Sequence, residues 1–250
     1  MNENFTDELH TLKLSEDGTY TAYSKEYDEH YHSTKDGALQ ESLKKHVIPA
    51  FRVCKKNEVN ILDICYGLGF NTLATIDYYA KNRPNTTLNI YSAELDSSLV
   101  KSLENFIYPK EFDGFGEIID AISRDGFYKK KNVKIEVFLG DAREYIKKFE
   151  DKFDIVYQDA FSADVNPMLW TKEYFSDIKN TMKKDAVLTT YSTALKIRLA
   201  LHENGFKVYL NSGEGFRAAT ISSLEEIEEF KKVDMEHKIS CNPDVRPLRD

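Results

Sequence analysis

Strand-like and helix-like segments alternate along most of this chain, and that alternation limits the folds that it can adopt. Seven short apolar segments are predicted to be strands: residues 60–65, 87–93, 133–139, 153–158, 186–191, 206–210 and 218–222. Helical patterns lie between most of them, for example at residues 97–106, 142–149, 171–182 and 193–204. Such alternation is typical of βαβ units, which build a parallel sheet through right-handed crossovers. Because only NSGEG separates the last two strands, we expect an α/β fold whose mostly parallel seven-stranded sheet ends in an antiparallel hairpin.

The segment before this alternation has a different pattern. Residues 11–24 alternate polar and apolar side chains around Asp17-Gly18, which predicts a β-hairpin. Apolar side chains then recur every four residues and indicate an amphipathic helix: Leu39, Leu43, Val47 and Phe51. We therefore expect three parts. These are an N-terminal hairpin and helix extension that covers the active site (1–58), the α/β domain (59–222) and a C-terminal tail (223–250).

The composition is that of a globular protein, since 41% of the 250 residues are hydrophobic and 30% are charged. No segment approaches the roughly 20 apolar residues of a membrane span, and the first ten residues lack the basic start and apolar run of a secretion signal. The three cysteines are widely spaced and odd in number, which argues against a disulfide framework and a zinc site. We therefore expect a cytoplasmic monomer or weak dimer without a membrane or metal partner. The net charge of −8 means that any contact with RNA must come from local lysine and arginine patches.

A glycine turn follows the first predicted strand and opens a helical pattern. A dinucleotide site needs Gly-x-Gly-x-x-Gly, but here Thr72 stands where the third glycine would be, after Gly67 and Gly69. Alone, such a turn is equally compatible with an ordinary tight connection between strand and helix. The next predicted strand ends at Glu94, whose carboxylate can accept hydrogen bonds from both hydroxyls of a ribose. Asp96, two residues later, is better explained as the residue that starts a helix.

A second acid follows a later strand, in Gly140-Asp141-Ala142. Asp141 can cap the helix that starts at Ala142, or accept a hydrogen bond from an adenine amino group, and both roles are possible at once. A glycine turn, a ribose-binding acid and this later acid together fit a nucleoside without a phosphate to hold. S-adenosylmethionine is such a ligand, so the sequence predicts that Gly67, Gly69, Glu94, Asp141 and Ala142 bind this methyl donor.

After the fourth predicted strand the chain reads DIVYQDAFSADVNPMLWT, from Asp154 to Thr171. This string resembles the Asp-Gly-Phe-Ala-Pro-x-x-Asn-Pro-x-Met-Trp motif of the bacterial tRNA (5-methylaminomethyl-2-thiouridine) methyltransferase family. That family includes the methylating half of the bifunctional MnmC enzymes and their stand-alone relatives. The resemblance covers most of the chain. YSKEYDEHYHSTKDGALQES is similar to the family's opening segment, ICYGLGFNTL to its Gly-x-Gly-x-Asn turn, GEGFRAAT to its glycine-rich basic loop and RPLRD to its tail.

The resemblance implies a Rossmann-like class I methyltransferase that uses S-adenosylmethionine. Its reaction would be methylation of the 5-aminomethyl group of a tRNA wobble (2-thio)uridine. Asp159 is the catalytic candidate because it ends a strand beside the ligand crevice, where it could bind the amine and accept or relay its proton. Asn71 joins the donor-binding candidates. The substrate-binding candidates are Tyr27 and Tyr31 in a covering lid, Glu41, Phe161 as a stacking surface, Asn166, Pro167 and Arg217.

Several features differ from the family pattern or leave alternatives open. Ala160 replaces the usual glycine, the basic loop keeps only Arg217, and a flavin-binding oxidase half is expected to be absent. An RNA-binding patch would be built from Arg217, the lysines at 129–131, Arg246 and Arg249.

The alternatives are methylation of a small amine or protein, an aminopropyl transferase like the spermidine synthases, and a non-catalytic binding module. The acidic net charge favours the first, while the Gly-Gly-Gly-Asp-Gly turn of the second is absent. For Trp170, a place in the core is favoured over stacking.

Overall fold

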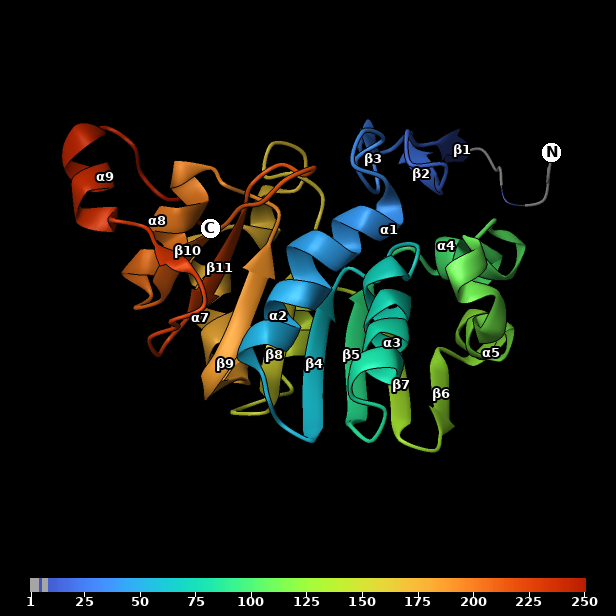
Figure 1. Ribbon diagram of the computed structural model, residues 1–250. Helices are drawn as coiled ribbons and strands as arrows, with labels where there is room; N and C mark the ends of the chain where they lie inside the picture. The colour runs from blue at the N-terminus through green and yellow to red at the C-terminus, as the bar shows by residue number, and fades with distance from the viewer. Residues whose placement is uncertain (1–4, 6–8) are drawn as a thin grey trace.

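The computed structural model describes Phe5 and residues 9–250. Residues 1–4 and 6–8, the first part of the predicted N-terminal extension, lie outside the described residues. A nine-stranded sheet forms the centre of the described chain (Figure 1). In spatial order its strands are β12 (Lys231–Lys232), β10 (Lys207–Asn211), β11 (Ala219–Ser223), β9 (Met182–Thr190), β8 (Phe153–Gln158), β4 (Glu58–Ile64), β5 (Thr87–Glu94), β7 (Val133–Leu139) and β6 (Phe127–Lys130).

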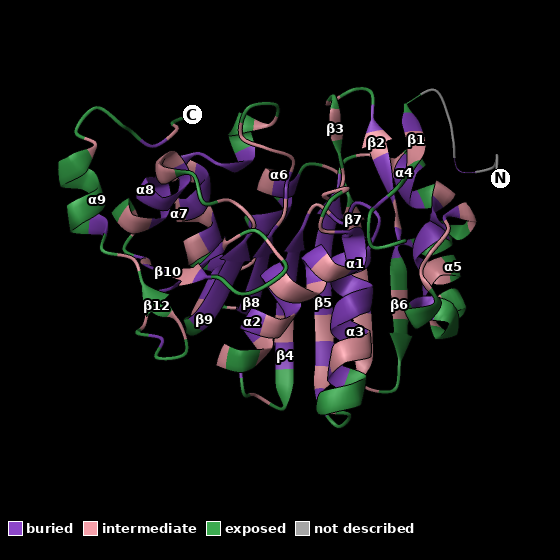
Figure 2. Cartoon of the chain, turned by 45° about the horizontal axis from the view of Figure 1, so that its top comes forward, coloured by how far each residue is buried: buried purple, intermediate pink, exposed green. Residues whose placement is uncertain are grey.

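The directions of the strands confirm the predicted mostly parallel sheet. The five strands from β9 to β7 are mutually parallel, whereas β11 runs antiparallel to both β9 and β10. All seven predicted strands are present, and the last two form the expected hairpin. The prediction missed β6 and β12, which extend the two edges of the sheet. Their sequences, FYKK and KK, carry no apolar alternation, because edge strands with lysine side chains are exposed to solvent (Figure 2).

Two hydrophobic cores lie on the two faces of the sheet, because successive side chains of a strand point to opposite faces. In β4, Ile61 packs into one core and Leu62 into the other, and Ile155 and Val156 of β8 divide in the same way. The first core is covered by α1 (Ala38–Glu41), η1 (Ser42–Val47), α2 (Ile48–Val53), α3 (Phe70–Asn82), α4 (Ser97–Ser102), η2 (Leu103–Asn105), η3 (Lys110–Phe115) and α5 (Gly116–Asp125). The second is covered by α6 (Ala142–Ile146), η4 (Pro167–Leu169), α7 (Lys172–Thr181), α8 (Leu195–Glu203) and α9 (Met235–Cys241).

The N-terminal part adds a small antiparallel sheet of β1 (His10–Leu14), β2 (Tyr20–Ser24) and β3 (Glu29–His30). It lies above the carboxyl ends of β4 and β5 (Figure 1), and β1 and β2 form the predicted hairpin. The predicted amphipathic helix is also present as the continuous helical segment α1–η1–α2. Its middle, η1, is π-helical, a local widening that is frequent at functional sites. Among the described residues, no helix is long and apolar enough to cross a membrane.

Candidate active site

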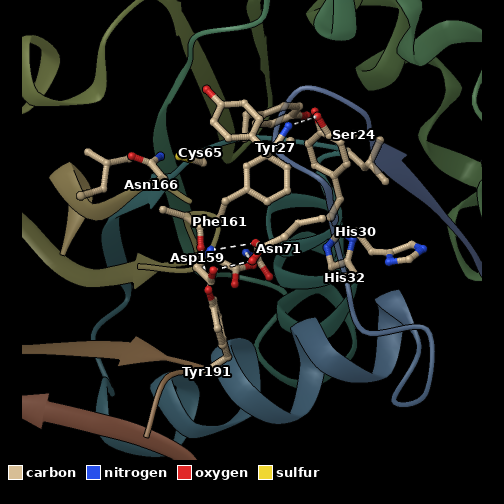
Figure 3. A pocket seen from close by; sticks show the side chains of 18 of the residues that line it. Ser24, Tyr27, His30, His32, Cys65, Asn71, Asp159, Phe161, Asn166 and Tyr191 are labelled. Atoms are coloured by element: carbon tan, nitrogen blue, oxygen red, sulfur yellow. Dashed lines mark hydrogen bonds between the residues drawn. The ribbon is translucent and has the colours of Figure 1, made fainter. Parts of the chain in front are cut away.

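A cavity of about 1110 Å³ opens at the carboxyl ends of the parallel strands, the usual place for ligands in such sheets. Its walls come from the segments that follow β4, β5, β7, β8 and β9, and from the N-terminal segment around β3. Typical small-molecule pockets measure roughly 300–1,000 Å³. The cavity is therefore large enough for a nucleoside cofactor together with a second ligand (Figure 3).

The glycine turn between β4 and α3 needs unusual backbone angles. Gly67 has a φ of 53° and Gly69 a φ of 75°, both in the left-handed region that glycine adopts without strain. A Cβ atom at Gly69 would also lie 2.9 Å from the hydroxyl oxygen of Tyr66. Gly67 lines the cavity, whereas Gly69 shapes the turn from behind it.

Glu94, the last residue of β5, ties this turn to the neighbouring strand. Its Oε2 accepts a hydrogen bond of 2.8 Å from the backbone N–H of Gly67, and its Oε1 accepts one of 3.0 Å from that of Asp96. Burial raises the pKa of the Glu94 carboxyl, although these backbone N–H groups act in the opposite direction. Glu94 still lines the cavity, so its remaining lone pairs are available to ligand hydroxyls. Asp96 caps α4 by accepting from the backbone N–H groups of Ser98 and Leu99, as expected.

The segment after β7 forms another part of the wall. Asp141 caps α6, accepting a 2.6 Å hydrogen bond from the backbone N–H of Arg143, and its exposed carboxylate also lines the cavity. Ala142 is buried beside it and also lines the cavity. Of the two roles predicted for Asp141, the cap is thus present, and the position leaves the carboxylate accessible to a ligand.

Asp159 follows β8 and faces the cavity beside the glycine turn (Figure 3). Its Oδ2 accepts a 2.8 Å hydrogen bond from Nδ2 of Asn71, and its Oδ1 lies 3.3 Å from Nε2 of His46. Burial alone would raise the pKa of Asp159. The neighbouring imidazole of His46, together with His32 and the hydrogen bond from Asn71, outweighs burial and holds that pKa below its ordinary value. Asp159 is therefore an anion at neutral pH.

Aromatic side chains also line the cavity that contains Asp159. Phe161 stacks on Tyr27, with ring centroids 4.7 Å apart and an interplanar angle of 24°, and Tyr31 packs against Phe161 at 4.9 Å. The backbone N–H and the hydroxyl of Ser162 donate to the carboxylate of Glu29 in β3. The N-terminal segment is thus held against the motif loop, and the face of Phe161 predicted to stack on a base is covered by Tyr27.

Of the other predicted substrate residues, Glu41, Asn166 and Arg217 line the cavity and Pro167 does not. Glu41 is buried in the wall, where its carboxylate pairs with Lys45 at 2.6 Å and accepts a hydrogen bond from the backbone N–H of Ser33. Asn166 lines the cavity, whereas Pro167 is exposed, starts the η4 turn and is not among the residues that line the cavity. Arg217 lines the cavity with an exposed side chain.

Some of the basic residues predicted to bind RNA, and Trp170, lie away from this cavity. The lysines at 129–131 lie at the end of β6 and in the turn into β7, at the opposite end of β7 from the cavity (Figure 1). They are therefore far from Arg217, with which the sequence analysis grouped them in an RNA-binding patch. Arg249 forms a 2.5 Å ion pair with Glu173 at the start of α7. Trp170 is fully buried and donates from Nε1 to the carbonyl of Phe161, which confirms its expected place in the core.

Comparison with known proteins identifies the family to which these features belong. A family model described as S-adenosyl-L-methionine-dependent methyltransferase matches residues 115–225. The crystal structure of MnmC2 from Aquifex aeolicus matches with a TM-score of 0.83 and 31% sequence identity, over 98% of this chain and 80% of that chain. The chain belongs to the MnmC-like methyltransferase family. This confirms the resemblance inferred from the Asp159 motif, the Rossmann-like fold and S-adenosylmethionine as the cofactor.

Other members and neighbours extend this picture. An uncharacterised protein of Methanocaldococcus jannaschii is 31% identical over 253 residues, which are 97% of this chain and 62% of that relative. The protein of Leptospira interrogans named tRNA 5-methylaminomethyl-2-thiouridine biosynthesis bifunctional protein MnmC is 27% identical over 212 residues, or 78% of this chain and 32% of that protein. The chain thus spans less than two thirds of the length of either relative. Spermidine synthase from Thermotoga maritima shares the fold alone, at 15% identity and a TM-score of 0.57.

The cavity of this MnmC-like protein fits S-adenosylmethionine. Oδ1 of Asn71 is a buried acceptor in the wall, without a hydrogen-bond partner among the described residues. Glu94, Asp141 and Asp159 surround the same space with carboxylates, which suit a ligand that carries ribose hydroxyls, an ammonium and a positive sulfonium. Asn71 and Glu94 are therefore the residues that would hold the donor's polar groups.

Four buried polar residues surround Asp159 to which the sequence analysis gave no role beside it. Asp63 in β4 accepts 2.9 Å and 3.4 Å hydrogen bonds from Thr72 and Asn71, and its burial, together with the charge of Asp159, raises its pKa to about 8. The other three are His32, Lys45 and His46. The available signal was the polar run Lys44-Lys45-His46 within an apolar helix stripe. Periodicity could not show which of these side chains turned inward, because η1 is π-helical.

Proposed function

We propose that this protein methylates the primary amine of 5-aminomethyl-uridine, or of its 2-thio form, at the tRNA wobble position, giving 5-methylaminomethyl-(2-thio)uridine. The observation that carries this proposal is the position of Asp159. Asp159 is the ionised acid of the family motif, and it lies in the cavity wall. It accepts a hydrogen bond from Asn71, which follows the glycine turn on the side of the methyl donor. The family membership and the name of the Leptospira relative support the choice of a tRNA substrate.

Asp159 acts on the substrate amine. S-adenosylmethionine supplies a methyl group that is activated by its bond to a positively charged sulfur. A protonated amine has no lone pair to attack it, so the amine must lose a proton and be aimed at the methyl carbon. The Asp159 carboxylate binds and orients the amine nitrogen. Because its pKa is lowered, it passes the proton onward instead of retaining it. Of the two roles expected for Asp159, relay is therefore favoured over storage.

The rim of the cavity offers contacts for a nucleic-acid backbone. Lys35 and Arg217 are exposed and line the cavity, and neither side chain forms a hydrogen bond or ion pair with another described residue. Two unpaired cations can contact phosphates beside the wobble base. The base itself would enter next to Phe161 by displacing Tyr27 from the stack, since single-stranded bases are read by aromatic stacking. Tyr31 and Asn166 would then line the base site. Such a protein would act in the cytoplasm as a monomer or weak dimer.

A second candidate is methyl transfer to a small amine or a protein. The net charge of −8 favours it, as does the number of acidic residues that line the cavity: Glu26, Glu29, Asp36, Glu41, Glu94, Asp96, Asp141 and Asp159. A polyamine would be attracted by these carboxylates without any need for cations at the rim. We place this function second because Lys35 and Arg217 would oppose such a substrate.

Nucleoside analysis of tRNA tests the proposal in cells. A strain that lacks this protein should accumulate 5-aminomethyl-uridine derivatives in its tRNA and lose the methylaminomethyl form. The gene for the unaltered chain should restore the methylated nucleoside, and the Asp159→Asn form should not. Unchanged nucleosides in the deletion strain would contradict the proposal.

A further inference from the structure

His46 is a buried histidine directly behind Asp159. It comes from η1, is fully buried, and does not itself line the cavity. Its Nδ1 lies 2.9 Å from the hydroxyl oxygen of Thr189 in β9, and its Nε2 lies 3.3 Å from Oδ1 of Asp159. The ring also packs edge-on against Tyr157 of β8, with centroids 5.7 Å apart. The imidazole is therefore fixed from both ends.

These contacts define how the ring acts. A neutral imidazole has one N–H donor and one acceptor nitrogen, and its partners decide which is which. Asp159 offers only acceptor oxygens when ionised, so Nε2 carries the hydrogen that faces it. Nδ1 accepts from the hydroxyl of Thr189 in a neutral ring and donates to it in a protonated ring, so Nε2 presents a hydrogen to Asp159 in either form. The Nε2 atom lies within 3.3 Å of Oδ1 of Asp159, although the pair does not have the geometry of a hydrogen bond.

Each oxygen of Asp159 thus has a separate neighbour. Asn71, which also lines the cavity, donates to Oδ2, and His46, which does not, approaches Oδ1, while Asp159 itself lines the cavity. We propose that His46 is a positioning residue that keeps Asp159 ionised and aimed at the substrate amine. This inference rests on the proposed function for the identity of that amine, but its effect on Asp159 can be measured without any substrate.

Other titratable groups surround His46 and Asp159, but none of those named below contacts the Asp159 carboxylate as His46 does. They are His32 from the N-terminal segment, Glu41 and Lys45 beside His46, Asp63 in β4, Tyr157 in β8 and Tyr191 after β9. Glu41 and Lys45 form a buried ion pair, so their charges largely cancel. Burial lowers the pKa of His32, so that ring carries less positive charge near Asp159 than an exposed histidine would. Only His46 and Asn71 directly contact the Asp159 carboxylate among these described residues.

Three variants test this role. His46→Leu removes the imidazole, and His46→Gln keeps a neutral N–H donor of similar reach. His202→Gln changes a partly exposed histidine of α8 outside the cavity and is the control. The carboxyl carbon of Asp159, assigned in an NMR titration by its absence from Asp159→Asn, should titrate at a higher pH in His46→Leu than in the unaltered protein. His46→Gln should give a smaller shift and His202→Gln none. An unmoved midpoint in both His46 variants would overturn the proposal.

Kinetics supply the second readout. With tRNA that carries 5-aminomethyl-uridine, kcat should fall by up to about 100-fold in His46→Leu, the scale on which a small misplacement of a reacting group slows a reaction. His46→Gln should recover part of this loss. The acidic limb of the pH profile should move to higher pH, while the Kd for S-adenosylmethionine stays unchanged. Loss of donor affinity in parallel with kcat would show a merely structural role. If His46→Leu does not fold, His46→Gln decides, and if the unaltered protein methylates no tRNA, the NMR titration still tests His46.

Discussion

Asn71 donates a 2.8 Å hydrogen bond from its side-chain amide to Oδ2 of Asp159, and this bond joins two functional regions of the cavity. Asn71 belongs to the first turn of α3, directly after the glycine turn, whereas Asp159 belongs to the motif loop after β8. Methyl transfer needs the donor methyl and the acceptor nitrogen in line at short range, and small displacements are costly. A direct bond between the two sides fixes their relative positions.

Replacing Asp159 by asparagine tests the charge at this position. Asp159→Asn keeps the size and the neighbours but loses the negative charge that binds the amine and relays its proton. We expect turnover to fall by roughly 100-fold or more, the scale of a lost general base, while the Kd for S-adenosylmethionine changes little. Steady-state kinetics and titration calorimetry measure the two quantities. Turnover near that of the unaltered protein would show that Asp159 is structural.

Glu94→Ala tests the donor side. The variant loses the acceptor for the Gly67 amide and for ligand hydroxyls, so donor binding should weaken by about 1–3 kcal/mol, or roughly 5- to 150-fold. Titration calorimetry with S-adenosylhomocysteine measures it, and Glu104→Gln, an exposed change outside the cavity, is the control. Equal affinity of Glu94→Ala and the unaltered protein would remove Glu94 from the site.

The sequence carried much of the fold and of the donor site, because both depend on local patterns. Alternating strand and helix segments, the missing third glycine before Thr72 and an acid at Glu94 each have meaning within a few residues. Gly67, Asn71, Glu94, Asp141 and Ala142 accordingly line one cavity. Pro167 starts the η4 turn and is not among the residues that line the cavity. A turn-forming proline and a substrate contact cannot be distinguished in a motif string.

Contacts between residues that are far apart in the sequence could not be derived in the same way. The surroundings of Asp159 depend on His46, about 110 positions earlier in the chain, and on the inward turn of a π-helical segment. The lysines at 129–131 form a basic run in the sequence, but the antiparallel pairing of β6 with β7 places them far from the cavity. Neither relation leaves a periodic signal.

Asp63 predicts a specific dependence of stability on pH. In the folded protein this buried carboxyl keeps its proton up to about pH 8, whereas in the unfolded chain it loses the proton near pH ~3.9. Between these values the folded state binds more protons than the unfolded state, so the contribution of Asp63 to stability falls as pH rises. Asp63→Asn removes this effect. The free energy of unfolding of Asp63→Asn, minus that of the unaltered protein, should therefore rise steadily from about pH 4 to about pH 8.

Urea unfolding at several pH values, without the donor, measures this difference. Asp113→Asn changes an exposed carboxyl outside the cavity and serves as the control. A difference between Asp63→Asn and the unaltered protein that stays constant with pH would mean that Asp63 is ionised in the folded protein.

Arg217→Ala tests the rim of the cavity as an RNA contact. Loss of one phosphate contact should weaken tRNA binding and reduce the slope of log affinity against log salt by about 0.7–0.9. Lys129→Ala removes one exposed positive charge at the far end of β7 and should leave both quantities unchanged. Filter binding over a range of salt concentrations measures the slopes. Equal effects of the two substitutions would show that the RNA does not approach this cavity.

Methyl transfer measured with three acceptors decides whether this cavity methylates an aminomethyl group on tRNA. Purified protein and radiolabelled S-adenosylmethionine are incubated with tRNA that carries 5-aminomethyl-uridine, with the same tRNA lacking the aminomethyl group, and with free polyamines. We predict that label enters the first acceptor alone, as 5-methylaminomethyl-uridine, and that Asp159→Asn nearly abolishes it. Methylation of the polyamines with no methylation of the modified tRNA would contradict the claim.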